Sequence, residues 1–326
     1  MKTRSFDFRD SLLSLLAITI TLFFIFPLYW GFSTSLRNPL DTFTVTGVGL
    51  PWLNFSPTLN NWISQLEIVE MRNAVINSVV VSFSTSLLTL CLGVPAAYAL
   101  ARFRFKKISN KDLTVWFLSQ RILPPVATVI PFYLTLQFLN LLDTRTGLIL
   151  INTTFTLPFA VVIMRQAFVD LPVELEEACL MDGANYFTTF SKIALPLCAP
   201  ALSATALIIF AFTWNELLFS LVISSKNAIT IPMFISGSFE SRGVQFWFLS
   251  VRTMIAMSIP ILIALLAQRY IVRGLTLGLS RGNCYFELVS CSLDLVLSFQ
   301  NIHISPSQIF LTVLPNGIFM PLLSKD

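Results

Sequence analysis

Long apolar runs that contain few or no charges alternate with short charged segments along most of this chain. Six of these runs contain the roughly 20 residues that a helix needs to cross a bilayer. They cover residues about 11–35, 75–100, 113–136, 147–168, 199–223 and 246–270. The pattern therefore predicts an all-α fold, a polytopic membrane helical bundle with six transmembrane helices.

The first and third runs contain residues that refine the prediction of a span. The first is too long for a secretory signal and keeps bulky Tyr29 and Trp30 near its end, so we interpret it as an uncleaved span. The third run has Pro124 and Pro125 at its centre. Proline removes helical hydrogen bonds, which membrane helices tolerate where neighbours or water satisfy the backbone. We therefore expect a kink or break in the third span.

Positive charges are distributed unevenly between the two sides of such a bundle. With the amino terminus inside, the external loops hold Arg37, Arg72, Arg145, Lys226 and Arg242. The internal segments and inner span ends hold Lys2, Arg4, Arg9, Arg102, Arg104, Lys106, Lys107, Lys111, Arg165, Lys192, Arg269, Arg273 and Arg281. The positive-inside rule then predicts a multi-pass protein of the cell (inner) membrane with a cytoplasmic amino terminus.

One transmembrane domain accounts for residues 1–281. The remaining residues, 282–326, fit neither a span nor a folded domain, because Pro306, Pro315 and Pro321 interrupt any spanning helix. We interpret them as an irregular carboxyl-terminal tail.

Composition narrows the function classes. Hydrophobic residues make up 55% of the chain and charged residues only 12%, about half the charged share of a soluble domain. The net charge of +4 is not gathered into a basic stripe, so nucleic acid is not expected as a partner. Five cysteines without paired short spacing and a single histidine, His303, predict neither a disulfide framework nor a metal site.

The polar segment between the fourth and fifth runs, residues 170–198, is predicted to lie in the cytoplasm. The stretch from Glu174 to Pro200, which covers most of this segment and the two residues after it, is ELEEACLMDGANYFTTFSKIALPLCAP. We expect a helix that starts near Leu171, with Asp170 as its cap and Pro172 in its first turn. Gly183 is expected to end it in a left-handed conformation.

This helix has apolar residues on both faces. Leu171, Leu175, Ala178 and Cys179 share one face, while Leu180 and Met181 flank Glu177 on the other. One face can pack on the bundle and the other can dock into a groove of a cytoplasmic protein; the alternative is a helix lying on the lipid surface. Acidic side chains favour a protein partner, because an anionic leaflet repels Glu174, Glu176, Glu177 and Asp182.

The same segment resembles the inner-membrane permeases of binding-protein-dependent ABC importers. Their loop has Glu-Ala-Ala, three residues, Gly, nine residues and Ile-x-Leu-Pro, and this chain departs from it only at Cys179. The matching residues are Glu177, Ala178, Gly183, Ile193, Leu195 and Pro196. The stretches LPPVATVIPFYL, LLDTRTGLIL, WNELLFSLVI and QRYIVRGLTLG are similar to the maltose-type carbohydrate branch.

The resemblance covers residues about 10–280 and implies a type I ABC importer permease fold. The family's usual carboxyl end falls soon after RGLTLG, so residues 282–326 depart from it, and read-through or a frameshift is an open alternative to a native tail. The resemblance further implies that a sugar or sugar-like solute crosses between this chain and a second, different permease, with which it forms a heterodimer.

The implied partners are that second permease, two ATPase subunits, an extracytoplasmic solute-binding protein and membrane lipids. The chain has no G-x-x-x-x-G-K-[ST] phosphate loop, so it is not expected to be an enzyme; ATP and Mg are used by the ATPase subunits, and this chain binds no cofactor. The resemblance makes the loop helix a coupling helix that docks on the ATPase. The expected coupling residues are Glu174, Glu177, Ala178, Asp182, Gly183, Ile193, Leu195 and Pro196.

Three charged residues lie within the predicted spans, and intramembrane charge is costly unless it faces a bundle interior or an aqueous path. Arg121, Glu216 and Arg252, with Trp214 and Asn215 beside Glu216, are therefore candidates for the translocation path. The alternatives are pairing between helices for Glu216 and snorkelling for Arg252. A secondary transporter with Glu216 as its proton-coupling carboxylate is the rival function, whereas no nucleophile, dyad or metal cluster suggests a membrane enzyme, and no catalytic residue is expected.

Overall fold

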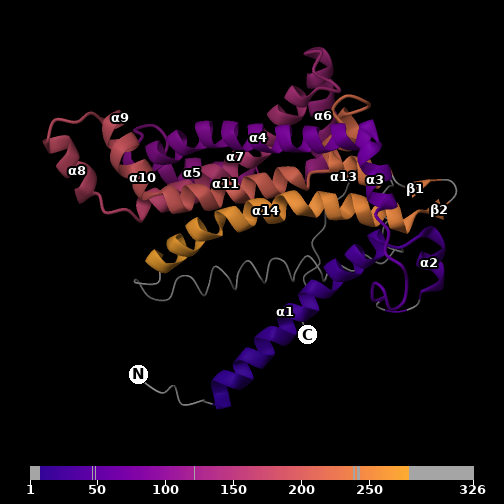
Figure 1. The fold of residues 1–326 in the computed structure, drawn as a ribbon. Helices are drawn as coiled ribbons and strands as arrows, with labels where there is room; N and C mark the ends of the chain where they lie inside the picture. Colours follow the sequence, from indigo (N-terminus) through magenta and orange to yellow (C-terminus); the bar gives the residue numbers. More distant parts are fainter. Residues whose placement is uncertain are drawn as a thin grey trace, which may run out of the picture. The chain divides into compact units, whose positions relative to one another are not determined.

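The computed structural model describes residues 8–45, 47, 49–120, 122–237, 239–240 and 243–278 (Figure 1). These residues are almost entirely helical, as predicted. Four helices are long and apolar enough to cross a membrane: α1 (Phe8–Ser35), α4 (Val69–Arg102), α7 (Arg145–Val169) and α14 (Phe246–Gly278). The chain divides into two compact units, residues 1–273 and 274–326, and of the second only the end of α14 is described.

The third predicted span is divided into two helices, as the proline pair indicated. α5 (Asn110–Ser119) ends before the prolines, and α6 (Pro125–Phe138) begins after Pro124, whose extended backbone makes it the residue preceding the first turn. The side chain of Ser109 caps α5 by accepting from the backbone N–H groups of Lys111 and Asp112. Residues 113–136 therefore form a broken span with an apolar second half.

The fifth predicted span is also broken. α11 (Ala199–Trp214) is followed by a gap and then by the short helix α12 (Leu218–Ile223). At its other end, α11 meets the preceding helical stretch, Tyr186–Leu197, at an angle of 75°. Counting this bent pair as one span gives five in the described residues, so the exact number of six stays a prediction.

Helices α4, α7 and α11 lie side by side and form the centre of the bundle, and α14 packs against them (Figure 1). α4 and α7 approach closely because Gly93 faces Ala160: a Cβ at position 93 would lie 2.8 Å from the Ala160 Cβ. The hydroxyls of Thr89 and Thr156 share a hydrogen bond of 2.8 Å across the same interface. Small and hydroxyl-bearing residues thus hold the two helices together, as is usual where lipid removes the hydrophobic driving force.

Several short elements gather at the end of the bundle where α4 and α14 begin. They are α2 (Pro39–Thr44), α3 (Asn60–Glu67), α13 (Ile231–Ser236) and the antiparallel pair β1 (Phe239–Glu240) and β2 (Gly243–Val244). Asn77 of α4 donates from Nδ2 to the carbonyls of Asn227 and Ile229, at 2.9 and 2.8 Å. Arg145 at the start of α7 donates to Asn77 Oδ1 at 2.7 Å. This network fixes one end of α4.

Candidate functional site

The segment that the sequence singled out forms a short helix, α8 (Glu174–Met181), at the opposite end of the bundle. It begins three residues later than predicted, because Asp170 ends α7 instead of capping α8. The Asp170 carboxylate accepts from Gln166 Nε2 at 2.9 Å, and Leu171 and Pro172 belong to the connection. Three glutamates in the first turn of α8 suit the positive end of its helix dipole.

The end of α8 agrees with the sequence. Gly183 has a φ of +89°, in the left-handed region. Its N–H donates to the Leu180 carbonyl at 3.0 Å, and the N–H of Ala184 donates to the Cys179 carbonyl at 3.2 Å. This pair of bonds is the Schellman motif, which satisfies the last carbonyls of a helix and favours glycine at this position.

The faces of α8 agree with the predicted ones only in part. Of the four residues expected on one face, Leu171 and Cys179 are half-buried, whereas Leu175 and Ala178 are exposed. On the other face, Glu177 and Met181 are exposed as expected, whereas Leu180 is half-buried. The buried residue is Glu176, which is only 5% exposed. The prediction did not foresee that the most deeply buried side chain of α8 is a charged one. The outward-facing side chains are those of Glu174, Leu175, Glu177, Ala178, Met181 and Asp182.

Glu176 is held by the end of α4. Glu176 Oε1 accepts from Arg102 Nε at 2.9 Å, and Arg102 Nη2 lies 2.8 Å from the same oxygen, so the two residues form an ion pair; Glu176 Oε2 accepts from the Tyr98 hydroxyl at 2.7 Å. Arg102 also donates to the Leu171 carbonyl at 3.2 Å, just before α8. Because the side chains of Arg102 and Glu176 are 11% and 6% exposed, water screens this pair weakly. We call Tyr98, Arg102 and Glu176 the α4–α8 clamp.

Reasoning from the sequence missed the α4–α8 clamp. Arg102 was counted only as a positive charge at an inner span end, and Glu176 only as one of several acidic residues. The partners are 74 residues apart along the chain, and no local spacing links them. The available signal was the polar pair of Tyr98 and Arg102, one helical turn apart at the end of an apolar span.

The rest of the loop leads from α8 back into the bundle. It consists of α9 (Tyr186–Thr189), the π-helix η1 (Phe190–Ala194) and α10 (Leu195–Leu197). Ala194 and Cys198 are buried against Met164 and Phe168 of α7, whereas Ile193 and Leu195 are half-buried and Pro196 is exposed at the start of α10. The coupling residues predicted in this part therefore lie next to the 75° bend that precedes α11.

The candidates for the translocation path do not form one group in the described residues. Trp214 is 3% exposed; its ring stacks on Phe210 and its Nε1 donates to the Ala256 carbonyl of α14 at 3.1 Å. In this structure it packs between helices and offers no free ring face for stacking on a solute. Arg121 lies outside the described residues.

The polar candidates are tied to nearby protein groups. Asn215 is exposed and donates from Nδ2 to the Ala211 carbonyl at 2.8 Å. The Glu216 carboxylate accepts from the backbone N–H groups of Phe219 at 2.7 Å and Ser220 at 3.2 Å, so it caps the first turn of α12. Neither contact is the interhelix ion pair that was the alternative for Glu216.

Arg252 does not simply snorkel towards water. Its Nε donates to Gln65 Oε1 of α3 at 2.7 Å, and its guanidinium lies 4.7 Å from the ring centre of Phe234 in α13. It thus connects α14 with two of the short helices. In the described part of the chain, no group of three or more His, Cys, Asp or Glu side chains is placed to hold a metal ion.

An apolar bundle with broken spans and an anchored amphipathic loop helix is the architecture of a polytopic membrane transporter. Residues 90–277 match the family described as the inner membrane component of binding-protein-dependent transport systems. The match covers more than half of the chain and includes both α8 and the α4–α8 clamp. The chain belongs to this family and is a permease subunit of an ABC importer.

Curated relatives agree over most of their length. The trehalose transport system permease protein SugB of Mycobacterium tuberculosis is 34% identical over 261 residues, which are 79% of this chain and 93% of the relative. The trehalose/maltose transport system permease protein MalG of Thermococcus litoralis is 30% identical over 270 residues, which are 82% of this chain and 95% of the relative.

Solved structures show the same fold. A chain from a bacterial ABC transporter involved in the import of the acidic polysaccharide alginate superposes with a TM-score of 0.66 at 21% identity. That alignment covers 82% of this chain and 99% of the alginate transporter chain. A chain of the MetNI methionine ABC transporter, in an inward-facing conformation, gives a TM-score of 0.51 at 17% identity over 63% of this chain and 95% of that chain.

Proposed function

We propose that this chain carries a carbohydrate through the membrane as one of two permeases of an ATP-driven importer, and that α8 couples it to a separate ATPase. The observation that carries the proposal is the arrangement of α8: one side is attached through buried Glu176, and the other presents Glu177, Met181 and Asp182 outward. A helix attached on one side and open on the other can transmit the motion of a docked partner.

The energy source is assigned to that partner. The chain has no phosphate-binding loop, so we assign the binding of Mg and the hydrolysis of ATP to two separate ATPase subunits. The exposed carboxylates of Glu174, Glu177 and Asp182 suit a basic docking surface, while Leu175 and Met181 suit an apolar groove. Gly183, Ile193, Leu195 and Pro196 set the course of the chain beyond the docked helix.

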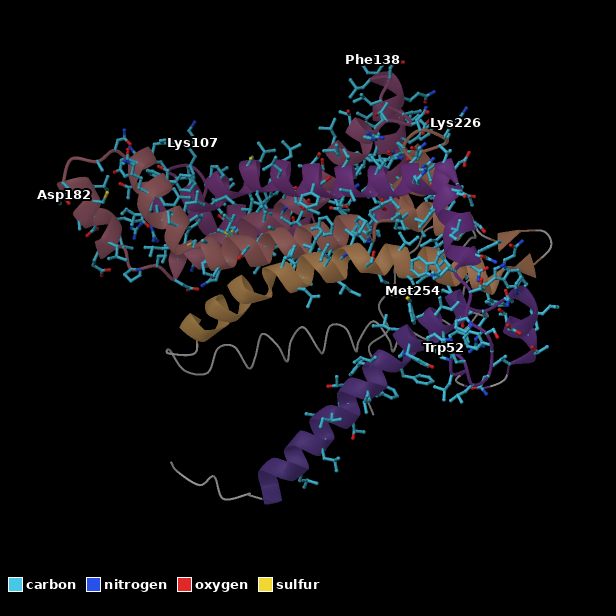
Figure 2. The ribbon with its side chains drawn as sticks, in the orientation of Figure 1. Trp52, Lys107, Phe138, Asp182, Lys226 and Met254 are labelled. Atoms are coloured by element: carbon cyan, nitrogen blue, oxygen red, sulfur yellow. The ribbon has the colours of Figure 1, made fainter. Side chains whose placement is uncertain are left out.

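The proposed orientation places α8 and the amino terminus in the cytoplasm. Figure 2 shows Asp182 and Lys107 at one end of the bundle and Lys226 and Phe138 at the other. The positive residues concentrate at the end with Lys107, which supports this direction. A single cysteine at Lys107 should then resist a membrane-impermeant thiol reagent in intact cells, and one at Lys226 should react with it.

The proposed substrate class rests on relatives named for trehalose and maltose transport and on the sequence of the fifth span. Asn215 is exposed next to Glu216 at the break between α11 and α12, where a polar solute could hydrogen-bond. Family membership favours this importer over an ion-coupled carrier that uses Glu216. A second permease completes the path, and an extracytoplasmic binding protein delivers the solute.

The decisive experiment is to purify the chain with its natural partners and reconstitute them in vesicles. We expect two ATPase subunits and a different permease to co-purify, and uptake of a sugar to require its binding protein and ATP on the α8 side. Collapsing the proton gradient should leave uptake unchanged. Uptake that needs the proton gradient and proceeds without ATP would contradict the proposal.

A further inference from the structure

The loop Gly49–Phe55 folds back along the end of α1 instead of projecting away from it. The Ser33 hydroxyl donates to the Gly49 carbonyl at 2.7 Å, and the Tyr29 hydroxyl donates to the same carbonyl at 3.3 Å. Ser33 and Tyr29 lie in the last two turns of α1, which ends at Ser35. The loop therefore begins beside the final turns of a membrane-spanning helix.

The loop is closed by its own hydrogen bonds. The N–H of Trp52 donates to the Phe55 carbonyl at 2.9 Å, and the N–H of Asn54 donates to the Leu50 carbonyl at 3.0 Å. The Asn54 side chain in turn accepts from the N–H of Leu50 at 2.9 Å. Because the N–H groups of Leu50, Trp52, Leu53 and Asn54 are bonded within the loop, moving these donors into a poorly hydrated environment costs less.

The inner side of the loop is fixed to the protein. Phe55 is buried, and the guanidinium of Arg37 lies 5.3 Å from its ring centre. Gly49 has a φ of +56°, and a side chain there would overlap the Arg37 guanidinium. Arg37, itself 3% exposed, thus fills the space beneath the loop. Both ends of the loop are held while its tip points outward.

The tip presents apolar side chains. Trp52 is 84% exposed and Leu53 is 79% exposed. Trp52 also has a φ of +64°, a conformation that costs a residue with a side chain about 1–2 kcal/mol. Trp62, by contrast, donates from its indole N–H to Ser35 and is half-buried. Residues 42–66 contain no charged side chain, so no ionised group in this stretch has to stay in water.

Contacts between α1 and α14 give the depth of the loop. Gly31 faces Met254, since a Cβ at position 31 would lie 3.0 Å from its methyl carbon. Met254 lies eight residues inside α14, which begins at Phe246, and eight residues of helix span about 12 Å. The turns of α1 that hold the loop are thus level with the first turns of α14, near the end that begins at Phe246. Figure 2 labels Trp52 and Met254 in this region.

We propose that Gly49–Phe55 is an interfacial anchor, whose Trp52 and Leu53 insert into the lipid leaflet at the Ser35 end of α1. Tryptophan favours the headgroup level, where its ring is apolar and its N–H can bond to water or lipid. Exposed apolar residues such as Phe26 and Phe32 continue the surface down α1. The depth and the absence of charge select lipid as the occupant, in preference to a protein that docks beyond the helix ends.

The test is depth-dependent fluorescence quenching in the complete importer. An environment-sensitive fluorophore is attached to Leu53→Cys, in a background without the natural cysteines, and reconstituted in phosphatidylethanolamine and phosphatidylglycerol vesicles. Glu67→Cys, which replaces an exposed charged residue at the end of α3, is the matched control. A nitroxide carried by lipid near the headgroup should quench the label at position 53 several-fold more strongly than the label at position 67, and aqueous iodide should show the reverse order.

Equal, weak lipid quenching at both positions would overturn the anchor. Protection from iodide without lipid quenching would also overturn it, because a protein, either the second permease or the binding protein, would then cover the loop. Trp52→Ser with the label kept at position 53 gives a second check. The lipid quenching at position 53 should fall, and persistence of the full signal would refute the role of Trp52. Neither result depends on the sugar or on coupling to an ATPase.

Discussion

Arg102 at the end of α4 and Glu176 in α8 form a largely buried ion pair, in which Arg102 Nη2 and Nε lie 2.8 and 2.9 Å from Glu176 Oε1. The same α4 is fixed at its opposite end through Asn77, which bonds to the backbone of Asn227 and Ile229. One continuous helix of 34 residues therefore links the loop helix α8 to the loops at the far end of the bundle. We expect this helix to carry a displacement of α8 to the other end of the bundle.

Breaking the α4–α8 clamp should release α8. Arg102→Ala leaves a buried carboxylate without its cation, a change that costs about 3–5 kcal/mol in comparable buried pairs. We expect hydrogen exchange across residues 174–183 to rise strongly in the purified complex. Arg104→Ala, which removes a nearby exposed arginine, is the control and should leave exchange unchanged. Unchanged exchange in Arg102→Ala would mean that the ion pair does not hold α8.

The clamp can also be tested by exchanging its charges. Arg102→Glu and Glu176→Arg should each detach α8, because each places two like charges together in a buried site. The double variant restores the opposite charges and should recover part of the protection. No recovery, together with normal amounts of folded double variant in the membrane, would indicate that the orientation of the pair and not its charge is essential.

Gly183 should tolerate side chains poorly for reasons of backbone alone. A Cβ there meets no atom within 4 Å, so the penalty is the left-handed φ, about 1–2 kcal/mol. Gly183→Val should misplace the chain after α8 and lower transport while membrane levels stay near normal. Gly47→Val is a matched control, because Gly47 also has a positive φ and open space but lies at the other end of the bundle. Similar transport losses in both variants would remove the special role of Gly183.

The Asp143 carboxylate holds the loop of residues 225–228, at the end of the bundle opposite α8. Burial alone would raise its pKa, but backbone N–H groups of Ser225, Lys226, Asn227 and Ala228 bond to the carboxylate and lower the pKa below its ordinary value of 3.8. A lowered pKa stabilises the folded loop above the unfolded-state pKa, and this stability is lost as the pH falls through the lower folded-state value. The loop should therefore stay folded at every pH of about 4 or higher.

The corresponding variant is Asp143→Asn, which turns a charged acceptor into a weaker neutral one. Since this site is partly exposed, we expect a loss of about 1 kcal/mol in local stability. The measurement is the reactivity of a cysteine at Lys226 with a thiol reagent, which should increase at neutral pH in the variant. A reactivity equal to that of the parent, at every pH above about 4, would contradict this account.

The apolar pattern predicted the all-α fold class and the four helices that are long enough to cross a membrane in the described residues, whereas the number of six spans stays a prediction. It also predicted the break before Pro125, because proline acts locally. The gap between α11 and α12 was not predicted, since WNELLFS contains no proline or glycine, and Glu216 satisfies the new helix start in the folded structure. Local sequence rules therefore predict where an apolar span lies, but not the tertiary contacts that interrupt it.

In the candidate site, too, local features were predicted and long-range contacts were not. Gly183 was predicted correctly because a helix end depends on a few neighbouring residues. The buried face of α8 was predicted only in part, because hydrophobic periodicity cannot recognise a glutamate that is buried through its ion pair with a distant arginine. The coupling role of Glu177 stays a prediction, as does the boundary of the tail at residue 282, which lies outside the described residues.

The tail offers a simple prediction. Stopping the chain after Gly282 should leave assembly and uptake nearly unchanged, because residues 282–326 have a composition that suits neither a span nor a packed domain. Membrane levels and initial uptake rates of the truncated and full-length chains provide the comparison. A large loss of either quantity would show that the tail contributes to the importer.

The central claim is that the outward side of α8 couples this permease to an ATPase. Glu177→Lys reverses an exposed charge where the partner is expected to dock, whereas Glu67→Lys makes the same change on α3 at the other end of the bundle. The direct measurement is ATP hydrolysis by the reconstituted importer, stimulated by substrate-loaded binding protein. We predict a loss of about tenfold or more in Glu177→Lys, equivalent to about 1.4 kcal/mol, and none in Glu67→Lys. Full stimulation in Glu177→Lys would contradict the claim.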